Sequence, residues 1–156
     1  MCSVKMLLTL KQRCCVLVKA KEKIIVNVAW KGRSELEANI RGAKLAIRTV
    51  EEEKRGPTAS ELLLAALGSS LATELLKEAR KMRIPIDNVE IKVKGIQTSK
   101  KIPRFTDINV QVSTTTAHDE DAKKLQELVR RLEKNSIVCN TLKEQTKIRI
   151  KTTFET

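Results

Sequence analysis

Apolar and polar positions alternate with a period of two in five short stretches of the chain, and a sixth short strand is predicted after the turn at 41–43. This alternation is typical of strands with one buried face. Glycine-containing turns at 31–34 and 41–43 separate the first three stretches, which predicts an antiparallel meander. The predicted strands are residues 24–30, 36–40, 45–50, 89–93, 108–112 and 148–154.

Between the third and fourth strands, residues 59–82 show the pattern of one long helix. Thr58 and Glu61 form a Thr-x-x-Glu capping box at its start. Apolar side chains cover more of the helix circumference than a surface helix carries, so we expect this helix to be largely buried. Residues 68–70 are Gly-Ser-Ser, small groups that permit close approach by another backbone or leave room for a ligand.

A second helix is predicted at residues 119–134, with an apolar face and three acidic residues at its positive amino end. The order is then meander, helix, hairpin, helix and strand, which indicates an α+β fold. At 156 residues the chain fits one domain, which we place at 24–156. Residues 1–23 form a basic amino-terminal extension, with candidate strands at 4–10 and 14–19.

Two motifs resemble the signatures of the OsmC/Ohr family, the osmotically inducible and organic hydroperoxide resistance proteins. Residues 56–70, Gly-Pro-Thr-Ala-Ser-Glu-Leu-Leu-Leu-Ala-Ala-Leu-Gly-Ser-Ser, are similar to the family's central helix, and 136–142, Ser-Ile-Val-Cys-Asn-Thr-Leu, to its second signature. The resemblance implies an OsmC-like fold, in which antiparallel sheets wrap around a long buried central helix. It also implies an intertwined homodimer, with each reactive site near the interface.

The same resemblance assigns candidate site residues. The family's peroxide-reducing cysteine corresponds to Ser70, and its resolving cysteine to Ser136. Glu61 matches the glutamate that orients an arginine beside the reactive thiolate. For that arginine we slightly prefer Arg33 over Arg41, since one sequence does not fix the alignment through the meander. A serine hydroxyl does not ionise near neutral pH and has no sulfenic acid form, so the two-cysteine cycle is not expected.

Cys139 is the only thiol within these motifs, three residues after Ser136. A buried structural cysteine is the favoured interpretation, and a relocated reactive thiol is the alternative. Hydrolysis through Ser70 would need a base, but His118 is the sole histidine and no triad motif surrounds it. The four cysteines lack the spacing of a zinc site, so we expect no metal and no cofactor.

The net charge of +12 raises the question of a polyanionic partner. Residues 1–33 hold eight Lys and Arg against one Glu, whereas residues 34–156 hold 23 against 18. Three aromatic residues are too few for a base-stacking platform, so a solvated charged surface is favoured over nucleic-acid binding. The longest apolar run, 62–67, is far shorter than a membrane span, and we expect a cytoplasmic protein without membrane attachment.

Three functional hypotheses follow from these observations. The first is an OsmC-like homodimer related to thiol-dependent hydroperoxide reductases, which has lost the peroxidase cycle and keeps an apolar pocket for a small ligand or hydroperoxide. The second is a peroxide reductase that uses Cys139 with an external thiol as resolver. The third is a basic module that binds nucleic acid or another polyanion.

Overall fold

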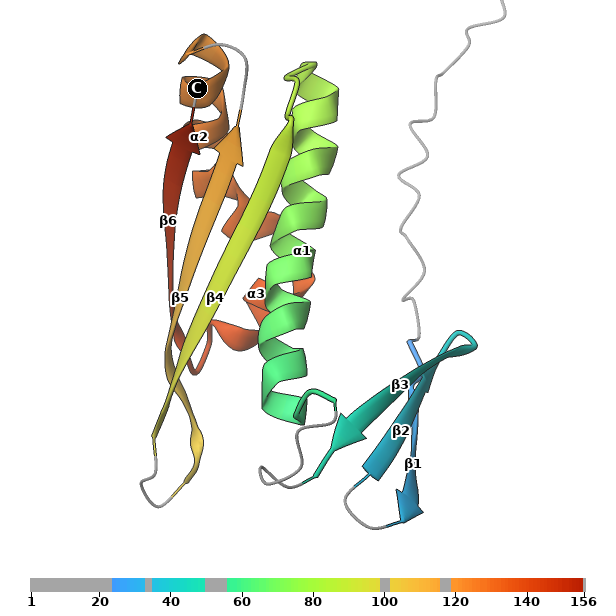
Figure 1. Cartoon of the computed structure of the whole chain (residues 1–156). Coiled ribbons are helices and arrows are strands. Elements are labelled where there is room, and N and C mark those ends of the chain that lie inside the picture. The colour runs from blue at the N-terminus through green and yellow to red at the C-terminus, as the bar shows by residue number, and fades with distance from the viewer. Residues whose placement is uncertain (1–23, 33–34, 50–55, 99–101, 116–118, 156) are drawn as a thin grey trace, which may run out of the picture.

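A computed structural model describes residues 24–32, 35–49, 56–98, 102–115 and 119–155 of the chain (Figure 1). Within these ranges the fold is α+β, as the sequence predicts. The amino-terminal extension predicted at residues 1–23, Arg33 and His118 lie outside the described residues, so the expectations about them remain predictions.

The first sheet is the predicted antiparallel meander, in the order β1-β2-β3. Its pairing aligns Val28 with Ala38 and Leu45, and Trp30 with Leu36 and Ile47. Because cross-strand partners share a face, one face of this sheet is apolar and the other is polar. The strands are β1 (Asn27–Gly32), β2 (Glu35–Ile40) and β3 (Ala43–Arg48).

Helix α1 (Ala59–Met82) has the predicted bounds. The capping box is confirmed, since the Thr58 side chain accepts a hydrogen bond from Glu61 N and the Glu61 carboxylate accepts one from Thr58 N. These bonds satisfy amides that have no partner within the helix. The helix ends at Arg83, whose left-handed backbone donates its N–H to the last turn.

The second sheet has the order β4-β5-β6 and is mixed. Strands β4 (Asn88–Thr98) and β5 (Arg104–Thr115) form the predicted hairpin, but β6 (Lys147–Glu155) pairs parallel to β5. The expectation of purely antiparallel sheets is therefore wrong at this strand. The reason is that a helical crossover between β5 and β6 returns the chain to the end at which β5 began.

That crossover contains two helices, α2 (Asp119–Asn135) and α3 (Ile137–Leu142). The first is the predicted amphipathic helix, and the second is a short helix that the apolar pattern did not reveal. Both lie with α1 on one face of the second sheet (Figure 1). The core between these layers is formed chiefly by Leu67, Leu71 and Leu75 of α1, Ile108, Val110 and Val112 of β5, and Leu125, Val129 and Leu132 of α2.

Within one chain, α1 is covered on only one side, so the expected burial of this helix is incomplete. Leu67, Leu71 and Leu75 are fully buried, but Leu63 and Leu76 each keep 38% of their surface exposed. The first sheet does not cover the open side, because it projects away beside the amino-terminal end of α1 (Figure 1). By length and hydropathy α1 could cross a membrane, and in this fold one side of it packs on the second sheet and α2.

Candidate functional site

The structure brings Ser70 and Ser136 into direct contact although they lie 66 residues apart. Their Oγ atoms are 2.9 Å apart, a hydrogen bond in which either hydroxyl can donate. Ser70 is half-buried on α1, and Ser136 is fully buried at the start of α3. The sequence motifs predicted that these two positions act together, and the fold places them together.

Ser136 is held by the local structure of α3. It is the N-cap of this helix, and its Oγ accepts a hydrogen bond of 3.1 Å from Cys139 N. Its own N–H donates to Leu132 O at 3.1 Å, which ties the α2–α3 junction together. Serine is favoured at an N-cap because its short side chain reaches the free amides of the first turn. These bonds therefore fix the position of the Ser136 side-chain oxygen.

Ser70 differs from the other hydroxyls on the same side of α1. Ser69 Oγ donates to Ala65 O and Thr73 Oγ1 donates to Ser69 O, both at 2.8 Å, so these two groups are satisfied by their own helix. The Ser70 hydroxyl instead reaches another element. Beside it is a surface hollow of about 340 Å³, lined by Ala66, Ser69, Ser70, Thr73 and Glu74. The serine pair is thus accessible from outside through Ser70 alone.

Glu61 lies at the beginning of α1, where Thr58 and Arg48 donate hydrogen bonds to its carboxylate. Its Oε2 accepts from Thr58 N at 2.7 Å and from Thr58 Oγ1 at 2.8 Å, and both carboxylate oxygens lie 3.4 Å from Arg48 Nη2. The hydrogen bonds from Thr58 and the charge of Arg48 lower the pKa of the Glu61 carboxyl. Its contribution to stability is therefore present above the unfolded-state pKa and is lost as pH falls through the lowered folded value.

Arg48 is a candidate that the sequence argument missed. It is the last residue of β3, and its backbone N–H donates to Pro57 O at 3.1 Å, which fixes the end of the strand beside the start of α1. Arg41 lies in the turn at the opposite end of β3, roughly 20 Å away along the strand. Arg41 therefore does not reach Glu61 within this chain. The signal available in the sequence was the position of Arg48 at the strand end that leads into the helix.

Two separate groups of polar residues result, the serine pair and the Arg48–Glu61 pair. Glu61 and Ser70 are nine residues apart on one helix, a rise of roughly 13 Å. An arginine bonded to Glu61 in the same chain therefore does not lie beside Ser70. Within one chain the two groups therefore do not meet at the same atom of a small ligand.

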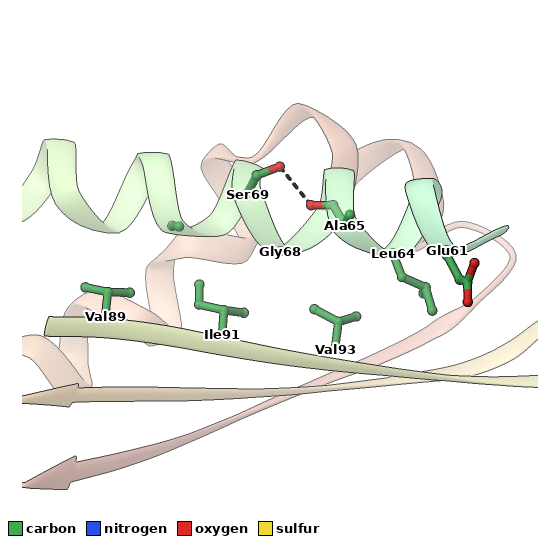
Figure 2. Close-up of a pocket in the computed structure, with 9 residues that line it drawn as sticks. Glu61, Leu64, Ala65, Gly68, Ser69, Val89, Ile91 and Val93 are labelled. Atoms are coloured by element: carbon green, nitrogen blue, oxygen red, sulfur yellow. Dashed lines mark hydrogen bonds between the residues drawn. The ribbon is translucent and has the colours of Figure 1, made fainter. Parts of the chain in front are cut away.

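A larger hollow of about 420 Å³ lies between α1 and β4 (Figure 2). Val89, Ile91 and Val93 point from β4 toward α1, and the Glu61 carboxylate stands at one end. Gly68 faces the strand here, and a Cβ added to it would be 3.1 Å from Val93 Cγ2. The glycine thus permits the close approach that the sequence suggested. The lining is apolar with one anionic end, and it includes Leu64, Ala65, Ser69 and Ala72.

Cys139 is 1% exposed and belongs to the hydrophobic core. Burial, with a smaller contribution from Glu133, raises the pKa of the thiol. Thiolate is the nucleophilic form, so both the burial and the pKa oppose reaction with a peroxide. This geometry agrees with the structural interpretation of Cys139.

We expect Cys139 to resist alkylation in the native protein. Labelling requires local opening of the core, so iodoacetamide at pH 8 should modify it on the order of 100-fold more slowly than in urea. Peptide mapping by mass spectrometry separates this thiol from Cys2, Cys14 and Cys15. Rapid native labelling of Cys139 would contradict the assignment of a core residue.

The described residues contain no group of three or more His, Cys, Asp or Glu side chains that could hold a metal ion. The start of α1 does not suit a cofactor phosphate either, because the Glu61 carboxylate lies where the phosphate would bind. The arrangement suits a small ligand that meets hydroxyl groups and an apolar surface.

Comparison with known proteins decides the family. A model of the family described as OsmC-like protein matches residues 51–151. The chain belongs to the OsmC-like family. A comparison with curated protein sequences gives no match.

Solved structures of OsmC and Ohr proteins share the fold of this OsmC-like chain. An OsmC-like protein from Mycoplasma pneumoniae superposes with a TM-score of 0.79 at 17% identity, covering 88% of this chain and 100% of that one. The organic hydroperoxide resistance protein OsmC from Legionella pneumophila gives 0.68 at 16%, with coverages of 86% and 99%. OhrB of Bacillus subtilis gives 0.61 at 18%, with coverages of 86% and 100%. At these identities the likeness concerns the fold.

Proposed function

We propose that this OsmC-like protein is a cytoplasmic homodimer that lacks the two-cysteine peroxidase cycle and binds a small apolar ligand or hydroperoxide. The observation that carries the proposal is the 2.9 Å contact between Ser70 Oγ and Ser136 Oγ. The fold keeps together two positions that, by resemblance to the family, hold the reactive and resolving thiols. Both positions carry alcohols here.

The chemistry of the pair follows from its atoms. A thiol cycle needs a thiolate to attack the peroxide O–O bond and a second thiol to convert the sulfenic acid to a disulfide. A serine hydroxyl supplies neither step, and the Ser136 hydroxyl is already engaged with Cys139 N. What the pair offers is one accessible hydroxyl, that of Ser70, which can donate to or accept from a bound polar group. This supports recognition of a ligand over its reduction.

The proposed dimer rests on uncovered apolar surface. The apolar face of the first sheet leaves Val28 57% and Trp30 70% exposed. The uncovered side of α1 adds Leu63 and Leu76. A second copy that places its first sheet over this side of α1 would bury both surfaces at once. It would also carry its Arg48–Glu61 pair toward the first chain's α1.

The proposed site for the apolar part of the ligand is the hollow between α1 and β4. Ser70 does not line this hollow, which shares only Ser69 with the smaller hollow beside Ser70. The valine, isoleucine, leucine and alanine lining of the larger hollow favours the apolar part of a small molecule, as ligand pockets generally do. Glu61 at one end has a lowered pKa and remains anionic near neutral pH, so it repels a ligand carboxylate and accepts a hydrogen bond from a neutral hydroxyl or hydroperoxyl group. An uncharged ligand with an apolar body is therefore favoured.

The experiment that tests this function is a hydroperoxide assay on the native protein. With cumene hydroperoxide and dithiothreitol, consumption should stay at the rate of the thiol alone, because no reactive cysteine is accessible at the site. The Cys139→Ser variant serves as the control and should give the same rate. Rapid turnover that this variant abolishes would contradict the proposal and establish Cys139 as the reactive thiol.

A further inference from the structure

The positive charge of this protein is unevenly divided between the elements of the fold. Helix α1 carries three acidic and three basic residues, and α2 carries five of each. Several of these charges are paired within a helix, as Lys77 with Glu74 and Lys124 with Asp121. The two long helices are therefore electrically balanced, and the excess must lie elsewhere.

The open face of the second sheet carries part of that excess. The side chains of β4, β5 and β6 alternate, and those facing the helices are the apolar core residues. The opposite face is covered by no described element (Figure 1). Among the described side chains, five cations point out on it, against the two carboxylates of Glu90 and Asp107. The five are Lys92, Lys94, Lys147, Arg149 and Lys151.

The cations stand in two rows with hydrogen-bonding groups between them. The register aligns Lys92 with Gln111 and Lys151, and Lys94 with Asn109 and Arg149. Charges within a row are two residues, roughly 6.7 Å, apart along a strand, and the rows on β4 and β6 are separated by two strand spacings, roughly 9.6 Å. The face is thus a shallow positive strip, in which the amide side chains of β5 lie between the cations of β4 and those of β6.

Most of these charges are available to a partner. Asp107 bonds to Arg149 at 2.7 Å, but within the described residues no carboxylate lies within 4.0 Å of the other four lysine ammonium groups. Lysine on edge strands also opposes strand-to-strand aggregation, a role that acidic residues would serve equally well. The unpaired charges among the described side chains of this face are four lysines against the one carboxylate of Glu90, so their excess is positive and points to an anionic partner.

We propose that the open face of the β4–β5–β6 sheet binds the phosphate backbone of double-stranded nucleic acid, independently of sequence. Charge complementarity supports this partner, because a duplex presents closely spaced phosphates along its surface. The described side chains of the strip include no aromatic group on which bases could stack, so a single strand would gain little beyond its phosphates. The amides of Asn109 and Gln111 donate hydrogen bonds to phosphate oxygens.

The test is binding of the full chain to a fluorescent 20-base-pair DNA duplex, measured by anisotropy between 50 and 200 mM salt. A sheet variant with glutamine at 92, 94, 147 and 151 should bind at least about tenfold more weakly at 50 mM salt. The magnitude of the slope of log K against log salt should fall by about 3.6, since each of the four lost phosphate contacts removes about 0.9.

A matched control removes four exposed cations from the helical layer, with glutamine at 123, 130, 134 and 143. It has the same net charge and should bind nearly as the parent does. Double variants, Lys92→Gln with Lys94→Gln and Lys147→Gln with Lys151→Gln, should each lower the magnitude of the slope by about 1.8, half of the decrease expected for the fourfold variant. These doubles keep the test decisive if the fourfold variant does not fold.

The proposal would be overturned by absence of duplex binding by the parent at 50 mM salt, by equal weakening in the sheet and control variants, or by tighter binding to the single strand of the same sequence. Undiminished binding by the sheet variants would assign the interaction to the basic residues at 1–23, and would equally reject the strip.

Discussion

Replacing both Ser70 and Ser136 with cysteine is expected to produce a protein that forms a disulfide between these positions on exposure to organic hydroperoxide. The Oγ atoms are already 2.9 Å apart, and a disulfide needs about 2.05 Å between sulfurs, so the two groups must approach by roughly 0.9 Å. One thiolate would attack the O–O bond, releasing the alcohol and leaving a sulfenic acid. The other thiol would then displace water from it to form the disulfide.

The controls for this variant are the two single substitutions, all in a Cys139→Ser background. Cys139 N bonds to the side chain at position 136, so this background prevents an alternative pairing with the nearby thiol. Mass spectrometry should find the disulfide between 70 and 136 only in the double variant, together with consumption of one hydroperoxide per chain. A folded double variant that gains no disulfide would show that the surroundings of the pair no longer support thiol chemistry, and would favour a long-separated binding role.

Placing lysine at Val28 and Trp30 is expected to dissociate the proposed homodimer. Both side chains lie on the apolar face of the first sheet, where a partner would bury them, and a buried unpaired ammonium group costs several kcal/mol. Light scattering should show the mass falling from twice 17.6 kDa to 17.6 kDa at low micromolar concentration.

The matched control for the dimer prediction places lysine at Asn27 and Ala29, which lie on the opposite, polar face of the same strand. It has the same added charge and should remain dimeric. A monodisperse, folded monomer of the parent protein would refute the intertwined arrangement, because an interface of this kind should bury above about 2,000 Å² and persist on dilution. Equal dissociation of both variants would attribute the effect to charge alone.

The elements of the fold could be predicted from local patterns. Alternation and turn residues located the six strands of the described residues, and the Thr58–Glu61 capping box located the start of α1, because these signals depend on residues close together in the chain. The short helix α3 was not predicted, since six residues show too little periodicity. The parallel pairing of β6 with β5 was not predicted either, because the direction of a strand depends on the path of the connection that leads to it and not on the strand's own pattern.

The roles of the candidate site residues stay predictions, but their positions in the fold can be compared with what the sequence suggested. The motif resemblance selected Ser70 and Ser136, and their contact agrees with that pairing. The arginine beside Glu61 was missed, because Arg48 reaches it only through the connection that joins β3 to α1. The role of Arg33 stays a prediction. Proximity between residues on different elements is a property of packing, and a single sequence does not record it.

The sequence by itself determined which segments are helix and strand, the alcohols at the two signature positions, and the total charge of this protein. Only the tertiary structure decided that Ser136 is buried against Ser70, that Cys139 lies in the core, and that α1 is covered on one side. It also decided that unpaired lysines lie together on the open face of the second sheet. The physical reason is that burial and electrostatic interactions depend on distances between elements, which are set only when the elements pack.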